Sequence, residues 1–153
     1  MSEQIPDSFI LNKKHFTFIE AEDIDELFDP EKFGLIPEGK SSDCWKGFIV
    51  RFRVKHLQLY VDKLYISCRD DIYPRFNGVK AVKSFWIPWM HVYKRIKLPL
   101  TYSGTLIIGN DLEEKFHDRA FTGPHCYSET YELRFESGIL TGFKNTSGIY
   151  EGF

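Results

Sequence analysis

Residues 45–66, WKGFIVRFRVKHLQLYVDKLYI, carry the clearest pattern in the chain. From residue 48 to residue 55 apolar side chains occupy every even position, and most of the side chains between them are basic. A period of two is typical of a strand that buries one face. A second apolar run, residues 57–66, follows after almost no gap. The two runs therefore predict a β-hairpin.

The second run changes the parity of its apolar positions part-way along. These positions are odd-numbered as far as Val61 and even-numbered from Leu64 onward. One extra residue in a strand shifts the alternation in this way while the same face stays buried. We therefore predict a β-bulge near Asp62 and Lys63.

The rest of the chain shows short apolar runs separated by turn residues. Further strands are predicted at about 80–87, 96–101, 104–109, 127–136 and 139–144, the last two forming a hairpin around Ser137-Gly138. Helical turns are predicted at 22–29 and at 110–121, the latter capped by Asn110 or Asp111. Pro99 cannot donate a ladder hydrogen bond, which places its strand at an edge or an irregularity.

About seven short strands with one or two short helices indicate a mostly β fold, either a β-barrel or a rolled antiparallel sheet. A chain of 153 residues without a repeat or linker predicts a single domain, residues 1–153. The aromatic content agrees with this prediction, because 14 Phe, 8 Tyr and 3 Trp favour strands over helices.

Charge and hydropathy argue against two classes of partner. The formal net charge is −2, which provides no overall attraction for nucleic acid. No run of 18 apolar residues is present, which argues against a membrane-spanning helix. The first residues lack the pattern of a secretory signal, and the three cysteines are scattered. We therefore expect a cytoplasmic protein with reduced cysteines.

Sequence motifs for cofactor or metal chemistry are missing. Zinc sites usually pair Cys or His ligands a few residues apart, and Cys44, Cys68 and Cys126 have no such spacing. Glycine-rich phosphate loops, metalloprotease motifs and nucleophile elbows are also absent from the sequence. We predict no cofactor, no metal and no assigned catalytic residue.

One short segment places His125, Cys126 and Glu129 close together. A hydrolase-type enzyme that uses these three residues is one hypothesis, because a cysteine nucleophile needs a nearby base. However, adjacent residues of a strand point to opposite faces, so His125 could not assist Cys126 if both lie in the strand. A buried structural cysteine is the commoner outcome.

Glu129 shares the parity of the apolar residues in its strand and is therefore expected to face inward. An inward carboxylate needs hydrogen-bond partners, or else it stays protonated. It could be a structural glutamate at a barrel end, or a polar anchor in an aromatic ligand cavity. For a ligand cavity, the candidate residues are Glu129, Tyr127, Tyr131, His125 and Trp45.

Two stretches carry charge of opposite sign. Arg51, Arg53 and Lys55 alternate along the first hairpin strand, whereas residues 20–31 contain seven acidic residues. Both can be simple solvated surfaces. Alternatively, the basic residues dock a charged partner protein, an arrangement that accelerates association. The sequence leaves homo-oligomerisation open.

The CWKGF motif of residues 44–48, followed by Leu59, Tyr60 and Val61, resembles a group of small uncharacterised bacterial β-proteins. In that group the motif reads Cys-Trp-Arg-Gly-Tyr and is followed by an alternating strand, a tight turn and Leu-Tyr-Leu. Here Lys46 and Phe48 replace the usual Arg and Tyr, and Lys55-His56 stands where the group has Asp-Gly. The resemblance implies a β fold and a bacterial origin, but no activity.

Three hypotheses of function follow, in order of preference. The first is a non-catalytic binding protein that engages another protein as an immunity-like or accessory factor. The second is a β-barrel that binds a small ligand in an aromatic cavity around Glu129. The third is the hydrolase-type enzyme with Cys126, His125 and Glu129.

Overall fold

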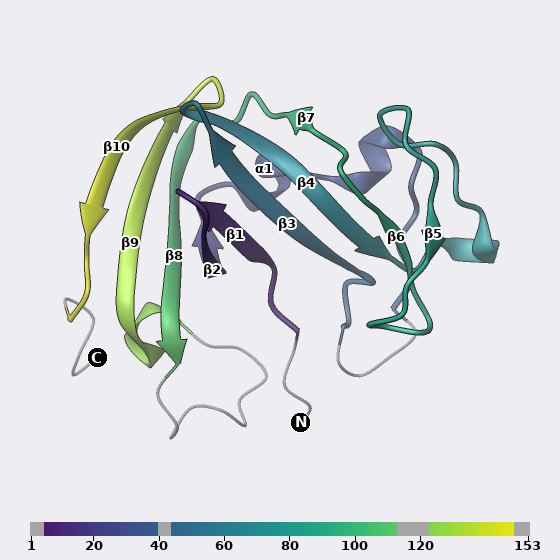
Figure 1. Cartoon of the computed structure of the whole chain (residues 1–153), viewed down its shortest axis with the longest axis horizontal. Helices are drawn as coiled ribbons and strands as arrows, with labels where there is room; N and C mark the ends of the chain where they lie inside the picture. The colour runs from purple at the N-terminus through teal and green to yellow at the C-terminus, as the bar shows by residue number, and fades with distance from the viewer. Residues whose placement is uncertain (1–4, 40–43, 113–122, 149–153) are drawn as a thin grey trace.

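The computed structural model describes residues 5–39, 44–112 and 123–148 (Figure 1). Within these residues ten strands form one sheet. Their bounds are β1 Ser8–Leu11, β2 Lys14–Ala21, β3 Phe48–Lys55, β4 Gln58–Ile66, β5 Val82–Lys83, β6 His91–Tyr93, β7 Leu98–Pro99, β8 Gly104–Leu112, β9 Tyr127–Glu136 and β10 Ile139–Asn145. The predicted mostly β class is confirmed.

Seven of the strands close into a barrel. Around the ring the order is β10-β9-β8-β2-β1-β3-β4, and β4 returns to β10 through the pairing of Gln58 with Ile139. The pairing of β1 with β3 is parallel, whereas the other ladders of the ring are antiparallel. This parallel pair departs from a purely antiparallel roll. β1 runs in the same direction as β3, and the chain reverses direction between β1 and β2.

The closure of the barrel joins the tips of two hairpins. The Leu59 N–H donates to the Gly138 carbonyl at 2.9 Å, and the Leu140 N–H donates to the Leu57 carbonyl at 2.8 Å. Beneath this contact, the Gln58 side-chain amide donates to the Leu100 carbonyl at 2.9 Å. The hairpin tips therefore lie together at one end of the barrel, as the apex in Figure 1 shows.

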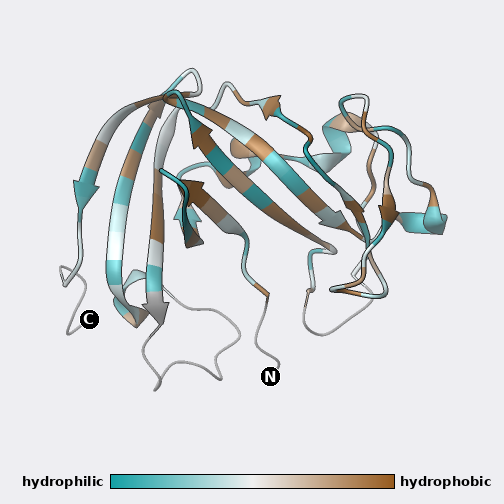
Figure 2. Ribbon diagram, in the orientation of Figure 1, coloured by the Kyte–Doolittle hydropathy of each residue, from teal (hydrophilic) through white to brown (hydrophobic). Residues whose placement is uncertain are grey.

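The hairpin of β3 and β4 confirms the predicted bulge. Arg51 lies opposite Lys63, but the next residue, Phe52, lies opposite Val61, which leaves Asp62 as the extra residue. The inward residues of both strands therefore stay apolar along their whole length, and Figure 2 shows the resulting alternation of brown and teal. The predicted closing hairpin is also confirmed by β9 and β10.

A single large apolar core lies inside the barrel. Several of its side chains have no solvent exposure, including Phe9, Leu59, Leu64, Ile108 and Leu133. Burying such a side chain contributes roughly 1.5–3 kcal/mol. A smaller apolar cluster lies on the outer side of β3 and β4, where Ile49 packs with Cys44, Ile87 and Met90. All three cysteines are buried, and none of them forms a disulfide.

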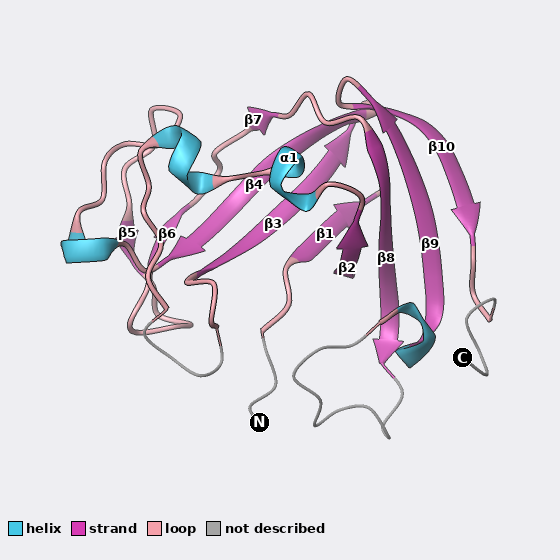
Figure 3. Cartoon of the chain, turned by 180° about the vertical axis from the view of Figure 1, so that it is seen from behind, coloured by secondary structure: helices cyan, strands magenta, loops and turns pink. Residues whose placement is uncertain are grey.

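The helices are shorter than the sequence pattern predicts. The prediction at 22–29 becomes α1 (Ile24–Leu27), followed by a 3-10 helix, η1 (Pro30–Phe33), which begins at a proline and ends at Gly34. Seen from behind in Figure 3, α1 crosses β3. Leu27 and the adjoining Phe28 are buried in the core. No helix among the described residues is long and apolar enough to span a bilayer.

Three other predicted elements need correction. The strand predicted at 96–101 shrinks to the two residues of β7, which pair with β4. The helix predicted at 110–121 is wrong in its first residues, because β8 continues to Leu112 and pairs with β9. The remainder of that prediction lies outside the described residues. The strand predicted at 80–87 shrinks to Val82–Lys83, because residues 84–90 form a turn before β6. The remaining short 3-10 helices are η2 (Arg69–Asp71) and η4 (Pro124–Cys126).

The barrel closure yields a stability prediction at Gly138. This residue has a φ of +83°, and a Cβ added there would lie 1.8 Å from the Leu100 carbonyl oxygen. We expect Gly138→Ala to lower the free energy of unfolding by about 3 kcal/mol or more, since strain of the left-handed backbone adds to a steric clash. Urea denaturation measures the loss.

Gly34→Ala is the matched control. Gly34 has a φ of +81°, but no atom lies within 4 Å of an added Cβ. Only the backbone strain remains there, about 1–2 kcal/mol. Equal losses in the two variants would contradict the assignment of Gly138 to the closure.

Candidate functional site

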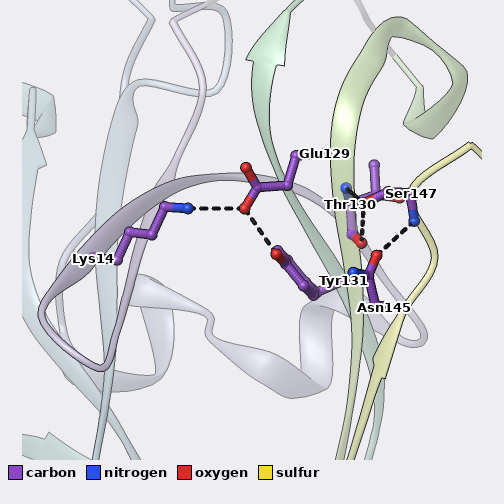
Figure 4. Close-up of polar contacts among 6 residues, drawn as sticks. All are labelled: Lys14, Glu129, Thr130, Tyr131, Asn145 and Ser147. Carbon is purple, nitrogen blue, oxygen red and sulfur yellow. Dashed lines mark hydrogen bonds and ion pairs between the residues drawn. The ribbon is translucent and has the colours of Figure 1, made fainter.

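Glu129 lies in β9, and both Lys14 and Tyr131 contact its carboxylate (Figure 4). Its Oε1 accepts hydrogen bonds from the Lys14 ammonium and from the Tyr131 hydroxyl, each at 2.9 Å. Lys14 is the first residue of β2, so the contact joins two strands that both neighbour β8. The side chain of Glu129 is 28% exposed. Glu129 shares the parity of the apolar residues of β9. Its carboxylate is stabilised there by an ion pair with Lys14 and a hydrogen bond from Tyr131.

Aromatic rings surround this carboxylate. Tyr131 meets Phe16 edge-on with ring centroids 5.6 Å apart, and it stacks on Phe143 at 5.1 Å. The Lys14 ammonium also lies 5.2 Å from the centroid of the Phe16 ring. Phe143 is 55% exposed, so the cluster borders solvent. Its polar atoms point at one another, an arrangement that favours a structural role.

The carboxylate of Glu129 changes the acidity of both partners. Its hydrogen bond with the Tyr131 hydroxyl raises the pKa of Tyr131 above the ordinary value. Its hydrogen bond with the Lys14 ammonium raises the pKa of Lys14 in the same way. Both shifts follow from one rule: a nearby negative charge favours the protonated form of its neighbours.

The neighbouring residue, Thr130, anchors the end of β10. Its N–H donates to the Ser147 Oγ at 3.0 Å, and the Ser147 N–H donates to the Asn145 side-chain oxygen at 3.0 Å (Figure 4). The Thr130 and Thr146 hydroxyls also lie 2.8 Å apart in a buried contact. This network fixes the strand on which Glu129 and Tyr131 lie.

His125 and Cys126 are closer than the strand argument allows. Both belong to the 3-10 helix η4 and precede β9. The His125 Nε2 lies 3.5 Å from the Cys126 Sγ, so the inference that the two side chains point to opposite faces is wrong. Since Cys126 has 0% exposure, a substrate has no access to its sulfur. Buried cysteines of this kind are usually inert.

The remaining residues predicted around Glu129 are dispersed. Tyr127 begins β9 and is buried, whereas Trp45 lies ahead of β3 and is 47% exposed. β3 is not a neighbour of β9 in the barrel. The structure therefore brings Tyr131 to Glu129 but places Trp45 on another part of the ring. Within the described residues no group of three or more His, Cys, Asp or Glu side chains could hold a metal ion.

Arg51 and Arg53 point outward from β3 beside the bulge of β4. Two nitrogens of Arg51, Nε and Nη2, each lie 2.8 Å from Asp62 Oδ2, while Arg53 Nη2 lies 3.7 Å from the same oxygen. The bulge therefore supplies a carboxylate that orients both guanidinium groups. Lys55 is exposed at the end of β3. Three positive charges meet one negative charge here, so the surface stays basic.

This basic surface continues across the sheet to β4 and the β5–β6 turn. Lys63 lies opposite Arg51, and its ammonium is 5.2 Å from the Tyr65 ring centroid. Tyr65 in turn meets Trp86 at 5.0 Å, edge to face. Residues on one face of neighbouring strands are thus linked in a row. We call this row the basic–aromatic face; its members are Arg51, Arg53, Lys63, Tyr65, Phe85 and Trp86.

The turn that carries Phe85 and Trp86 is well anchored. The Ile87 N–H donates to the Ser84 Oγ at 2.9 Å, and the Met90 N–H donates to the Ile87 carbonyl at 3.0 Å. Ile87 and Met90 are buried in the outer cluster, whereas Phe85 is 99% and Trp86 is 60% exposed. The exposed rings are therefore presented by a turn whose other side chains are packed.

Our sequence reasoning missed this aromatic turn. A signal was present, because residues 72–110 contain six Lys or Arg and no acidic residue, with the sequence FWIPW at 85–89. The net charge of the whole chain concealed that local excess of positive charge. A scan of charge in windows would have detected it.

Searches against protein-family models, curated proteins and solved structures found no match to this chain. The resemblance carried by the CWKGF motif therefore stays a prediction. Any functional inference rests on the geometry of the chain itself.

The Glu129 cluster yields a prediction about acidity. Glu129→Gln removes the charge beside the Tyr131 hydroxyl, so we expect the pKa of Tyr131 to fall towards its usual value of about 10. NMR titration of the tyrosine Cζ resonances measures this. Tyr102 is the control, because burial rather than a neighbouring side-chain carboxylate is the main cause that raises its pKa to about 12. An unchanged Tyr131 titration would contradict the assignment.

The same shift predicts how stability depends on pH. Because the folded pKa of Tyr131 lies above the unfolded value, the stabilisation is complete below about pH 10 and is lost as the pH rises through the folded pKa. Glu129→Gln should weaken this loss. Denaturation at pH 8 and pH 11 with both proteins tests the sign.

Proposed function

We propose that this protein is a non-catalytic binding protein that engages another protein through its basic–aromatic face, as an accessory or immunity-like factor. The observation that carries the proposal is the exposure of Phe85 and Trp86 on an anchored turn. A phenylalanine side chain with 99% exposure offers no benefit to the fold of its own chain. Exposed aromatic residues grouped in this way are typical of interaction sites.

The composition of the face supports a protein partner. Trp, Tyr and Arg dominate the residues that contribute most to binding at protein interfaces. The face supplies all three in one row, through Trp86, Tyr65 and Arg51. The Arg53 side chain is 40% exposed, and its Nη2 lies 3.7 Å from Asp62 Oδ2, so the exposed end of its guanidinium can reach a partner carboxylate.

The charge around the face indicates the chemistry of the partner. Lys80 and Lys83 flank the aromatic turn on one side, and Lys94 and Arg95 follow β6 on the other. A surface of this sign attracts an acidic partner and increases the association rate, with strong dependence on salt. We therefore propose an acidic protein surface with an apolar recess for Phe85.

The arrangement of His125, Cys126 and Glu129 supports the non-catalytic reading. The Cys126 sulfur is buried, and the Glu129 carboxylate already binds an ammonium and a phenol. Neither group is presented to a substrate in the way a nucleophile or general base requires.

The proposal predicts that Phe85→Ser and Trp86→Ala each weaken partner binding without loss of the fold. The wild-type protein, immobilised, should retain an acidic protein from lysate of its source organism at 1:1 stoichiometry. With that protein purified, calorimetry should give at least about tenfold weaker binding for each variant, as expected of central aromatic residues.

Phe143→Ser is the matched control. Phe143 is also an exposed aromatic residue, but it lies on β10 beside Tyr131 and outside the basic–aromatic face. Its replacement should leave the retained protein unchanged. Retention of the same proteins by wild type and Phe85→Ser would refute the proposal, as would retained material that nuclease removes.

A further inference from the structure

A second feature, separate from the basic–aromatic face, is a cavity of about 230 Å³ at the end of the barrel where β1 and β3 begin. It opens between these strands and α1. None of its lining residues belongs to the set predicted around Glu129. The lining consists of Asp7, Phe18, Ile24, Asp25, Leu27, Phe28, Lys46, Phe48, Val50 and Phe52.

Four phenylalanine rings contribute to its wall. Phe18 and Phe52 pack with ring centroids 5.5 Å apart, and Phe28 meets Phe48 edge-on at 6.3 Å. A cavity of roughly 150 Å³ already accommodates benzene. The space is therefore large enough for a small aromatic or branched alkyl group.

The cavity also contains a fixed carboxylate. Asp7 is only 8% exposed; its Oδ1 accepts from the Val50 N–H at 2.9 Å, and its Oδ2 accepts from the Lys46 ammonium at 2.6 Å. The Lys46 nitrogen also lies 4.7 Å from the centroid of the Phe48 ring. At this point an ammonium of the chain itself is bound between a carboxylate and an aromatic face, the geometry by which proteins recognise organic cations.

Charge at the mouth favours a further cation. Asp25 lines the cavity and is exposed, so the lining contains two carboxylates and one ammonium. The surrounding stretch, residues 20–31, has seven acidic residues and no basic one. An anionic guest would meet net repulsion, and a cationic guest would meet net attraction.

We propose that this cavity binds an organic ammonium ion. The apolar body of the guest lies among the phenylalanine rings, and its cationic group lies at the mouth of the cavity beside Asp25. The ammonium belongs either to a free small molecule or to a lysine side chain. The proposal does not depend on the basic–aromatic face, which lies on the outer surface of β3 and β4.

The test is an NMR titration of the full chain with three probes. Benzyltrimethylammonium represents a free organic cation, Nα-acetyl-trimethyllysine amide represents a lysine side chain, and 3-phenylpropanoate is the anionic comparison. We expect at least one cation to shift the amide signals of Asp25 and Phe48 and to bind at least fivefold tighter than the anion. The tighter cation identifies the source. Equal affinity for the anion, or shifts elsewhere, would overturn the proposal.

Two variants locate the charge that acts on the guest. Asp25→Asn should weaken cation binding at least threefold, whereas Asp23→Asn removes the same charge from the same exposed stretch, outside the cavity lining, and should leave binding unchanged. Equal effects of the two would show a general field and would contradict a site.

Lys46→Met provides an independent readout of Asp7. It removes the internal ammonium from the Asp7 carboxylate, so a guest cation can replace it and should bind several-fold tighter. Weaker or unchanged binding in a folded Lys46→Met variant would overturn the role of the carboxylate. If the variant does not fold, the Asp25 and Asp23 pair decides the proposal.

Discussion

The structure depends on the contact that closes the barrel between the β3–β4 and β9–β10 hairpin tips. One ladder pair, Gln58 with Ile139, joins β4 to β10. Gly138 reinforces it, because its carbonyl accepts from Leu59 and its N–H donates to Tyr102. Beyond this contact the edge of β4 is covered by β7 and β6, so Gln58 and its neighbours are where β10 meets the ring. The left-handed backbone of Gly138 therefore supports the closure through which seven strands enclose a common core.

The sequence was sufficient to predict the parts of this barrel in which alternation is long. β3, β4 and β9 were predicted from their apolar pattern, and the parity change near Asp62 predicted a bulge that the structure confirms, whereas β1 and β2 were not predicted. The inward orientation of Glu129 follows from the same rule. Its partner could not be predicted in this way, because Lys14 is 115 residues away and meets it only once β2 and β9 have both paired with β8.

Short elements and surface features lay beyond that reasoning. β5 has two residues and β6 has three, too few for any period to show. The parallel pairing of β1 with β3 depends on the path of the chain and not on local propensity. Likewise, His125 and Cys126 lie in the 3-10 helix η4 and not in the strand that the sequence argument assumed for them. The aromatic turn was missed for a different reason. A net charge summed over the whole chain cannot show that one segment is basic and another is acidic.

β3 connects the two proposed sites because its two faces serve different purposes. Phe48, Val50 and Phe52 line the cavity, while Arg51 and Arg53 point to the outer surface. A shift of one residue in its register would exchange these sets, placing guanidinium groups in the cavity and phenylalanines in solvent. The bulge at Asp62 prevents such a shift, since it keeps the partner strand in phase and its carboxylate binds both arginines. The apolar alternation of β3 specifies which of its faces is the core, and the ion pairs around Asp62 reinforce that choice on the outer face.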